Sequence, residues 1–316
     1  MIFSYGGKRP PRELVRRVER GEAAGVMLYA RSIRSRAQLR RTLSGLQRAA
    51  RRSPVHLPLL LLIDQEGGFV QRLPGGPTRS AARVGSTLGA YRTGLQAGST
   101  LRRVNINVNL APVADVCRAR SVLERELRCY SRRPSVVRAR TRAFARGLRR
   151  RGVVPAAKHF PGLGAARKNT DDGPVTIRAS RSTLRRVDER PFAGLAPMVM
   201  LSNAVYPAFD RHRVAALSRA VIVGELRRRL GFRGVTISDA FDTPTGFGLG
   251  GPARIALTAA RADLDLILFA HTYTDSATAA RTLESALRSG RISREPFLQS
   301  VGRVLALRRR AARLRG

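Results

Sequence analysis

Short apolar runs alternate with longer stretches of helical periodicity along the whole chain. Within residues 135–152, for example, Val137, Thr141, Phe144 and Leu148 recur at spacings of four, three and four, which places them on one helix face. Runs that are apolar throughout are typical of strands covered on both faces. Eight such runs are predicted as strands: 2–7, 25–31, 57–64, 104–113, 152–160, 197–203, 234–240 and 264–270. Strands of this kind separated by amphipathic helices indicate a parallel sheet.

Eight strand–helix units in a chain of 316 residues predict an α/β fold, a closed (β/α)8 (TIM) barrel, with residues 1–316 forming a single domain. A doubly wound open sheet is the alternative, but no GxGxxG follows the first strand. No internal repeat, low-complexity linker or second domain divides the chain. We therefore interpret the Gly- and Pro-rich segments 74–77 and 244–252 as long loops that follow strands, rather than as linkers between domains.

The chain is strongly basic, with a formal net charge of +39 and 60 basic residues, of which only Lys8, Lys158 and Lys168 are lysines. Such a charge would suit a nucleic-acid-binding protein. The arginines are dispersed, however, without a basic tail or the interleaved aromatic residues of a single-strand binder. We therefore expect no specific nucleic-acid partner, only nonspecific adhesion to polyanions at low salt.

Nothing in the pattern predicts a transmembrane segment, because the longest strongly apolar run, 57–63, is far too short to cross a bilayer. The first residues also lack the apolar region of a signal peptide. As it stands, the sequence predicts a cytoplasmic monomer. A mis-assigned start codon would leave room for an export signal, in which case the protein is exported.

The chain has two cysteines, Cys117 and Cys129, and no CxxC motif. No spacing of His, Cys and carboxylate residues suggests a metal site, so we expect neither metal nor cofactor. The sequence leaves two states of the cysteines open: a disulfide, or two buried thiols.

Polar residues stand at the ends of several predicted strands. Asp64, Lys158-His159, Ser202-Asn203 and Ser238-Asp239 each close an apolar run. In a barrel of this type the carboxyl ends of the strands meet around one pocket, which is where the chemistry takes place. We therefore expect acidic, basic and amide groups to converge there.

Five segments carry a resemblance to a known family: IDQEGGFVQRL, NVNLAPVADV, KHFPGLG, YPAFD and LGFRGVTISDAFD. They resemble glycoside hydrolase family 3, and in particular its single-domain branch of bacterial β-N-acetylhexosaminidases of cell-wall recycling. The likeness runs from about residue 2 to residue 310, in order. It implies a (β/α)8 barrel and a retaining hydrolysis of β-linked N-acetylglucosamine in cell-wall-derived glycans, through a covalent glycosyl-aspartate.

The resemblance also implies roles for individual residues. The family's nucleophile, the first Asp after the Ser of an SDD-like motif, matches Asp239. The residues that bind sugar hydroxyls match Asp64, Lys158 and His159, and an arginine of an RSFG-like segment matches Arg128 in RCYS. These chemical types fit the task, since carboxylates accept hydrogen bonds from sugar diols and basic groups donate to their oxygens.

The chain departs from the family pattern at one critical loop. The single-domain branch places its general acid/base in an Asp-Ser-His sequence eleven to thirteen residues after the lysine, where this chain has Asn169-Thr170-Asp171. In one interpretation, Asp171 or Asp172 replaces the histidine, and two adjacent aspartates raise each other's pKa. In a second, the loop is disabled. In a third, residues 171–174 are only a turn, and the acid comes from elsewhere or from the substrate.

The sequence thus predicts a glycoside hydrolase of the β-N-acetylhexosaminidase type, with a non-catalytic carbohydrate-binding barrel as the alternative. Other residues have structural interpretations. Glu66 has a catalytic and a structural interpretation, of which we favour the structural one, in which it ties its loop to the barrel rim. Asp115 is expected to close a strand end by hydrogen bonding. Phe69 stands where the family has an arginine, and His271 follows the last strand.

Overall fold

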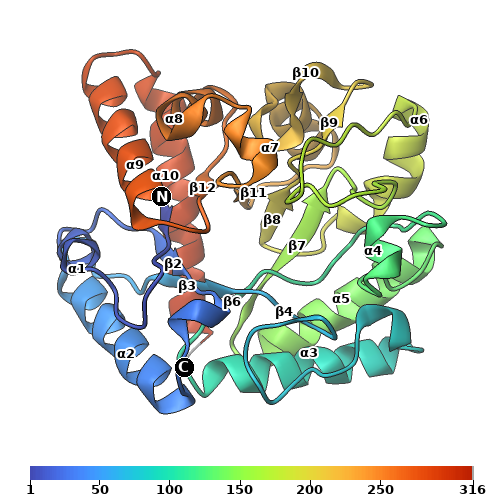
Figure 1. Cartoon of the computed structure of the whole chain (residues 1–316), viewed down its shortest axis with the longest axis horizontal. Helices are drawn as coiled ribbons and strands as arrows, with labels where there is room; N and C mark the ends of the chain where they lie inside the picture. The colour runs from blue at the N-terminus through green and yellow to red at the C-terminus, as the bar shows by residue number, and fades with distance from the viewer. Residues whose placement is uncertain (315–316) are drawn as a thin grey trace.

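The protein forms a closed barrel of eight parallel strands surrounded by helices (Figure 1). The structure is a computed structural model and describes residues 1–314. The barrel strands follow one another in chain order, and β1 pairs with both β2 and β12 to close the ring. They are β1 (Ile2–Phe3), β2 (Gly25–Met27), β3 (Leu60–Ile63), β6 (Val108–Asn109), β7 (Val154–Phe160), β8 (Met198–Leu201), β11 (Val235–Ala240) and β12 (Leu266–Leu268). Each lies inside one of the eight predicted runs, so the predicted fold is confirmed.

The strands are apolar throughout because both of their faces are covered. Alternate residues face the barrel interior and form one cluster, and the residues between them pack outward against the helices. In β3, for example, Leu60 and Leu62 belong to the interior cluster, whereas Leu61 and Ile63 belong to the outer layer. This alternation decides which side chains point inward at the carboxyl ends of the strands.

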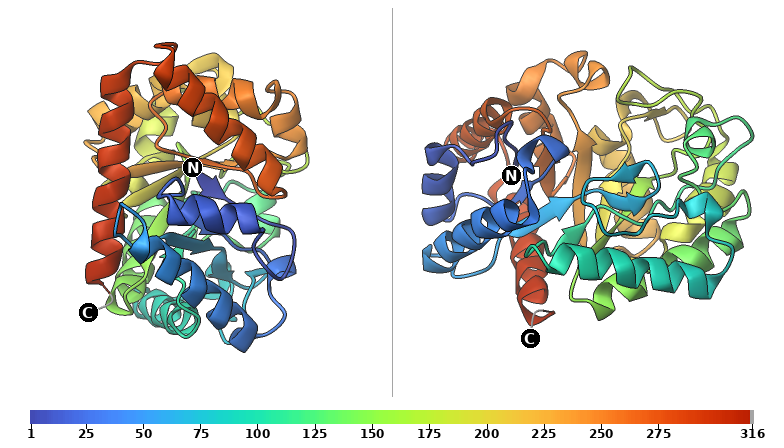
Figure 2. Two further views of the ribbon diagram at one scale, coloured as in Figure 1. Left: turned by 90° about the vertical axis from the view of Figure 1, so that its left-hand side faces the viewer. Right: turned by 60° about the horizontal axis from the view of Figure 1, so that its bottom comes forward.

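Helices cover the outside of the barrel (Figures 1 and 2). The longer ones are α1 (Arg12–Glu19), α2 (Arg36–Arg52), α3 (Thr87–Arg102), α5 (Pro134–Arg150), α8 (Gly251–Arg261), α9 (Tyr273–Arg288) and α10 (Arg294–Arg313), together with the π-helical segment η6 (Ala220–Arg229). Shorter helical segments are η1 (Ala30–Ser32), η2 (Ala81–Arg83), α4 (Val122–Arg125), α6 (Arg181–Thr183), η3 (Leu184–Asp188), η4 (Arg190–Phe192), η5 (Ala215–Leu217) and α7 (Pro244–Phe247). The predicted helical face of α5 is confirmed, because Val137, Thr141, Phe144 and Leu148 are all buried.

Helices α3 and α5 run side by side at very short range (Figure 1). A Cβ added at Gly94 of α3 would overlap with the backbone of Phe144, and one added at Gly147 of α5 would overlap with the backbone of Tyr91. The two glycines therefore permit the close crossing. Strands β6 and β7, whose ends carry site residues, flank α5 in the chain.

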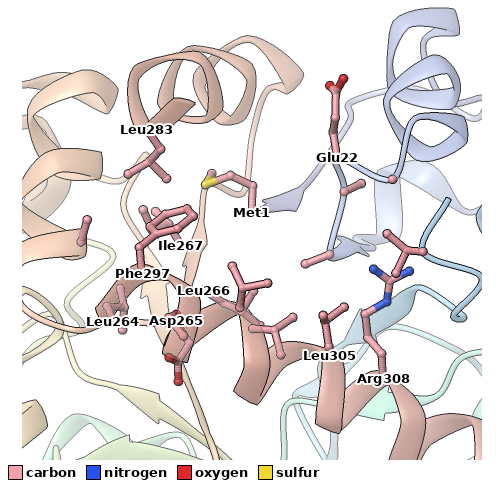
Figure 3. A pocket seen from close by; sticks show the side chains of 18 of the residues that line it. Met1, Glu22, Leu264, Asp265, Leu266, Ile267, Leu283, Phe297, Leu305 and Arg308 are labelled. Atoms are coloured by element: carbon pink, nitrogen blue, oxygen red, sulfur yellow. The ribbon is translucent and has the colours of Figure 1, made fainter. Parts of the chain in front are cut away.

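The last helix, α10, closes the amino-terminal end of the barrel. Val304, Leu307 and Ala311 pack into the interior cluster, and Arg308 donates hydrogen bonds to the carbonyl oxygens of Leu57 (2.7 Å) and Pro58 (2.8 Å) before β3. A cavity of about 290 Å³ lies beside α10 (Figure 3). Its lining is mainly apolar and includes the starts of β1 and β12, so it lies at the opposite end from the predicted pocket.

Two insertions follow barrel strands as hairpins. One consists of β4 (Gln65–Gly67) and β5 (Val70–Gln71), directly after β3, and the other of β9 (Val205–Tyr206) and β10 (Asp210–Val214), directly after β8. Cys117, in the loop after β6, forms a disulfide with Cys129, and their Cα atoms are 6.0 Å apart. The structure thus selects the disulfide from the two predicted states. Within residues 1–314, no helix is long and apolar enough to cross a membrane.

Candidate active site

The barrel strands deliver polar side chains to one layer above the apolar interior. Asp64, Lys158 and Asp239 each follow an interior residue of the same strand by two positions: Leu62, Ala156 and Ile237. Because side chains alternate along a strand, this spacing points the three polar groups inward at the carboxyl end of the barrel. Three of the predicted strand-end groups therefore converge.

Lys158 links two acidic residues in this layer. Its Nζ lies 2.6 Å from Oδ1 of Asp64 and 2.7 Å from Oε1 of Glu66. Burial opposes the positive charge of Lys158, but the two carboxylates outweigh it and raise the pKa of the ammonium group. The Asp64 side chain remains 14% exposed, against 4% for Lys158, so Asp64 is the more accessible member of this pair.

Arg128 reaches the same cluster from the loop after α4. Its guanidinium binds Glu66 with two hydrogen bonds of 2.9 and 3.0 Å and Glu126 with one of 3.0 Å. Burial opposes the ionisation of Glu66, but Arg128 and Lys158 overcome it and lower the pKa of Glu66 to about 2. Glu66 thus ties the hairpin after β3 to the barrel, as expected, and is fully engaged in ion pairs rather than free for catalysis.

His159 is held by the buried Asp115. The Nδ1 of His159 lies 2.7 Å from Oδ2 of Asp115, whose oxygens also accept the backbone N–H groups of His159 and Leu163. The predicted strand-closing role of Asp115 is therefore confirmed. Since Nδ1 is engaged, Nε2 is the ring nitrogen that can meet a ligand.

The loop that carries Asp171 is a turn docked on the neighbouring loop. Asn169 accepts the backbone N–H of Asp171 through its side-chain oxygen (3.1 Å) and that of Asp172 through its carbonyl oxygen (3.2 Å). The hydroxyl of Thr245, in α7 after β11, donates to the carbonyl oxygen of the buried Thr170. The turn is thus fixed against the segment that follows Asp239.

Asp171 has the electrostatics of a proton donor. The residue is exposed to solvent, yet crowding by protein atoms, together with the negative charges of Asp239 and Asp64, raises the pKa of its carboxyl to about 6, against the opposing effect of His159 and Arg128. The carboxyl therefore lies within electrostatic range of all four groups. Asp172 is exposed and contributes its backbone to the turn.

Some predicted pocket residues instead brace the strand ends. Asn203 is buried and donates to the carbonyl oxygen of Ala240 (2.7 Å), next to Asp239. Ser202 accepts the backbone N–H of Ala204, and Ser238 accepts that of Leu268. All three side chains are buried and hydrogen-bonded to backbone groups, although Oδ1 of Asn203 has no partner among the described residues.

Two features escaped the sequence interpretation. Tyr29 follows the interior residue Met27 by two positions and packs against the interior cluster, a signal that the alternation in residues 25–31 already contained. Asp242 accepts the backbone N–H groups of Ala270 and His271, and its Oδ2 lies 3.3 Å from Nδ1 of His271. The His271 side chain is 60% exposed, so it lies on the rim.

In the described part of the chain, no three His, Cys, Asp or Glu residues are grouped so that they could hold a metal ion. The site combines carboxylates, which accept hydrogen bonds, with ammonium and guanidinium donors at the carboxyl ends of parallel strands. Carboxyl groups beside such donors in a (β/α)8 barrel are the kind of arrangement that glycoside hydrolases use.

The chain belongs to glycosyl hydrolase family 3, since the Glycosyl hydrolase family 3 N terminal domain matches residues 4–307. This confirms the predicted family. An "Uncharacterized secreted glycosyl hydrolase" of Arthroderma benhamiae is 34% identical over 98% of this chain and 91% of its own length. A "Beta-hexosaminidase" of Xanthomonas campestris pv. campestris is 32% identical over 86% of this chain and 85% of its own.

Solved structures of similar proteins agree with this family assignment. A glycoside hydrolase family 3 beta-N-acetylglucosaminidase from Paenibacillus sp. str. FPU-7 superposes with a TM-score of 0.90 at 30% identity, covering 100% of this chain. A Beta-N-acetylhexosaminidase from Beutenbergia cavernae gives 0.84 at 27% identity, covering 97% of this chain and 96% of its own. The chain spans 61% of the Paenibacillus enzyme and 55% of Beta-hexosaminidase A of Pseudoalteromonas piscicida, which have additional sequence.

Proposed function

We propose that the protein is a retaining β-glycosidase that hydrolyses β-N-acetylglucosaminides, with cell-wall-derived glycans as the source of substrate. The observation that carries this proposal is the placement of two acidic residues: Asp239 at the carboxyl end of β11, and Asp171 in a turn that Thr245 fixes against the segment following Asp239. Crowding and the nearby Asp239 raise the pKa of the Asp171 carboxyl to about 6. A retaining hydrolase needs one carboxylate to attack and a second carboxyl group that holds a proton near neutral pH. The substrate class is supported by the relatives named β-hexosaminidase and β-N-acetylglucosaminidase.

In the first step, an oxygen of Asp239 attacks the anomeric carbon while the bond to the leaving oxygen breaks. The electron pair of that bond goes to the leaving oxygen, which takes the proton of Asp171. The products of this step are the free aglycone alcohol and a covalent glycosyl ester on Asp239. The position of Asp239, inward-facing at the end of β11 and partly exposed, suits this role.

In the second step, Asp171 acts in its ionised form. It accepts a proton from water, the water oxygen bonds to the anomeric carbon, and the ester oxygen leaves as the restored Asp239 carboxylate. Two inversions at the anomeric carbon retain its configuration. A pKa near 6 lets one residue serve in both directions at ordinary pH.

The remaining residues bind the sugar. Asp64 accepts hydrogen bonds from hydroxyl groups, while Lys158, Arg128 and His159 donate to or orient sugar oxygens. Lys158 and Arg128 are already fixed by Glu66, so they need little reorganisation on binding. Asp64→Ala and Lys158→Ala should therefore raise KM and lower kcat/KM together.

The test is a panel of chromogenic glycosides assayed with wild type and Asp239→Asn. Wild type should hydrolyse the β-N-acetylglucosaminide, and Asp239→Asn should lower kcat by roughly a thousandfold or more. Glu284→Gln, which alters a carboxylate that is 56% exposed on α9, is the matched control and should leave kcat unchanged.

A slow 2-fluoro sugar should label the peptide that contains Asp239, as mass spectrometry would show. Labelling at Asp64, or undiminished turnover by Asp239→Asn, would overturn the assignment of the nucleophile. Binding of N-acetylglucosamine without turnover of any glycoside in the panel would identify the non-catalytic alternative instead.

A further inference from the structure

Tyr29 is an unassigned member of the layer that holds the proposed site. Strands β2 and β3 pair in register, with Gly25 opposite Leu60 and Met27 opposite Leu62. The backbone N–H of Leu28 also donates to the carbonyl oxygen of Leu62, so the pairing continues beyond β2. Extending the register by two residues places Tyr29 opposite Asp64, with both side chains facing inward.

The ring of Tyr29 is fixed, whereas its hydroxyl is unused. The guanidinium of Arg31 lies 4.6 Å from the ring centroid, and the ring packs on the interior cluster. Among residues 1–314, nothing forms a hydrogen bond with the Tyr29 hydroxyl, yet it is not among the side-chain polar atoms sealed from solvent without a partner, as the hydroxyl of Tyr5 is. The hydroxyl is therefore available to a ligand.

The charges around Tyr29 make this hydroxyl a donor. Burial, together with the carboxylates of Asp64, Asp242 and Asp239, raises the pKa of Tyr29 well above its usual value, against the smaller effect of Arg31. The phenol therefore keeps its proton at any pH at which the enzyme would work. Asp64 has the strongest influence of the three carboxylates, which agrees with the strand register.

A sugar hydroxyl that is bound by a carboxylate is stabilised by a hydrogen-bond donor on its other side. The hydroxyl gives its only proton to Asp64, and its oxygen then has lone pairs that require donors. The ammonium group of Lys158 is shared between Asp64 and Glu66, whereas the O–H of Tyr29 has no partner of its own. A phenyl ring at position 29 would provide the same packing but would lack this donor.

We propose that Tyr29 is a specificity-determining substrate contact, whose O–H donates to the same sugar hydroxyl that donates to Asp64. This inference rests on the proposed function and deepens it, because it assigns the recognition of one hydroxyl of the pyranoside to a Tyr–Asp pair. The pair selects pyranosides that carry this hydroxyl and rejects those that lack it.

The experiment compares wild type, Tyr29→Phe, Asp64→Ala and a matched control for the tyrosine, Tyr91→Phe. Tyr91, on α3, also lies beneath a guanidinium, that of Arg146 at 5.1 Å from its ring, but it is on the outside of the barrel. Calorimetry measures the binding of N-acetylglucosamine and of its 3-, 4- and 6-deoxy analogues, and kcat/KM is measured on the chromogenic β-N-acetylglucosaminide.

Tyr29→Phe should weaken binding of N-acetylglucosamine and lower kcat/KM about tenfold, the usual scale for one lost hydrogen bond, whereas Tyr91→Phe should change neither. The analogue that lacks the shared hydroxyl should bind to wild type and to Tyr29→Phe with equal affinity. For Asp64→Ala, this same analogue should bind as well as N-acetylglucosamine itself. If Tyr29 had only a structural role, the two variants would not single out the same analogue.

The outcomes separate the two proposals. If wild type binds and hydrolyses the glycoside but Tyr29→Phe behaves like Tyr91→Phe, or loses the same factor with every analogue, the Tyr29 inference is wrong while the proposed function stands. If wild type neither binds N-acetylglucosamine nor hydrolyses its glycosides, the proposed function fails and the inference fails with it.

Discussion

Nδ1 of His159 lies 2.7 Å from Oδ2 of Asp115, a carboxylate with no exposed surface. The same carboxylate accepts the backbone N–H of Leu163 at 2.6 Å, so one buried side chain orients the imidazole and fixes the loop that follows β7. The proposed ligand-binding end of β7 thus depends on a residue that no ligand touches.

Removing this carboxylate should therefore affect stability and sugar binding together. Asp115→Ala leaves the backbone N–H groups of His159 and Leu163 without their acceptor, and we expect a loss of about 3 kcal/mol in the free energy of unfolding. Urea unfolding measures this loss, with the exposed Glu284→Gln as the control. A stability equal to that of wild type would show that water or a shifted loop replaces the carboxylate.

The pH dependence of catalysis should report Asp171. The first step needs the protonated carboxyl, whose pKa is raised to about 6, so kcat/KM should fall about tenfold per pH unit above about pH 6. Asp171→Asn should lack this basic limb, and Asp172→Asn should keep it. Poor leaving groups should lose roughly a hundredfold or more in Asp171→Asn, because they depend most on protonation.

Azide provides the complementary measurement on Asp171. In Asp171→Ala the glycosyl-enzyme should accumulate with activated aryl glycosides, because no base activates water in the second step. Azide needs no base, so it should restore turnover and yield a glycosyl azide of retained configuration. If Asp171→Ala and Asp172→Ala both retain wild-type rates on aryl and alkyl glycosides, the loop is a turn without a catalytic role.

Acid should remove the stabilising contribution of Glu66. The folded-state pKa of Glu66, about 2, lies below its ordinary value of 4.5, so the contribution is fully present above about pH 4.5 and is lost as the pH falls towards 2. The shift corresponds to about 3 kcal/mol. Glu66→Gln should therefore be less stable than wild type at pH 7, with the difference shrinking at acid pH. A pH-independent difference would contradict this interpretation.

The disulfide should contribute a comparable amount. It closes a loop with a sequence separation of 12 residues, for which chain entropy predicts a stabilisation of about 3 kcal/mol. Cys117→Ser/Cys129→Ser should lose this amount under oxidising conditions, as thermal or urea unfolding would show. In the presence of dithiothreitol, wild type and the double variant should unfold alike; a difference that persists there would have another origin.

The sequence predicted all eight barrel strands, but only some of the side chains in the site layer. Continuous apolar runs are a strong local signal, so all eight barrel strands fall where the pattern placed them. The inward direction of Asp64, Lys158 and Asp239 follows from the same alternation. Tyr29 obeys this rule as well, but an aromatic residue at the end of an apolar run also fits ordinary core packing, which concealed it.

Other features depend on loop geometry that no local pattern encodes. The ion pair between Arg128 and Glu66 joins residues 62 positions apart, and its existence depends on how two long loops fold over the barrel. The sequence could not distinguish Asp171 from Asp172 for the same reason, since adjacent residues of a turn point in different directions. The burial of Asn203 likewise follows from a backbone acceptor, Ala240, in the neighbouring strand.

The contact between the hydroxyl of Thr245 and the carbonyl oxygen of Thr170 has a consequence for engineering. The loop that carries Asp171, the proposed proton donor, packs on the loop that follows Asp239, the proposed nucleophile. The conformations of the two loops therefore depend on each other. Transplanting either loop alone into a related barrel would separate the donor from the atom it must protonate. A chimera that exchanges aglycone preference should therefore carry residues 169–172 and 241–246 together, as a single cassette.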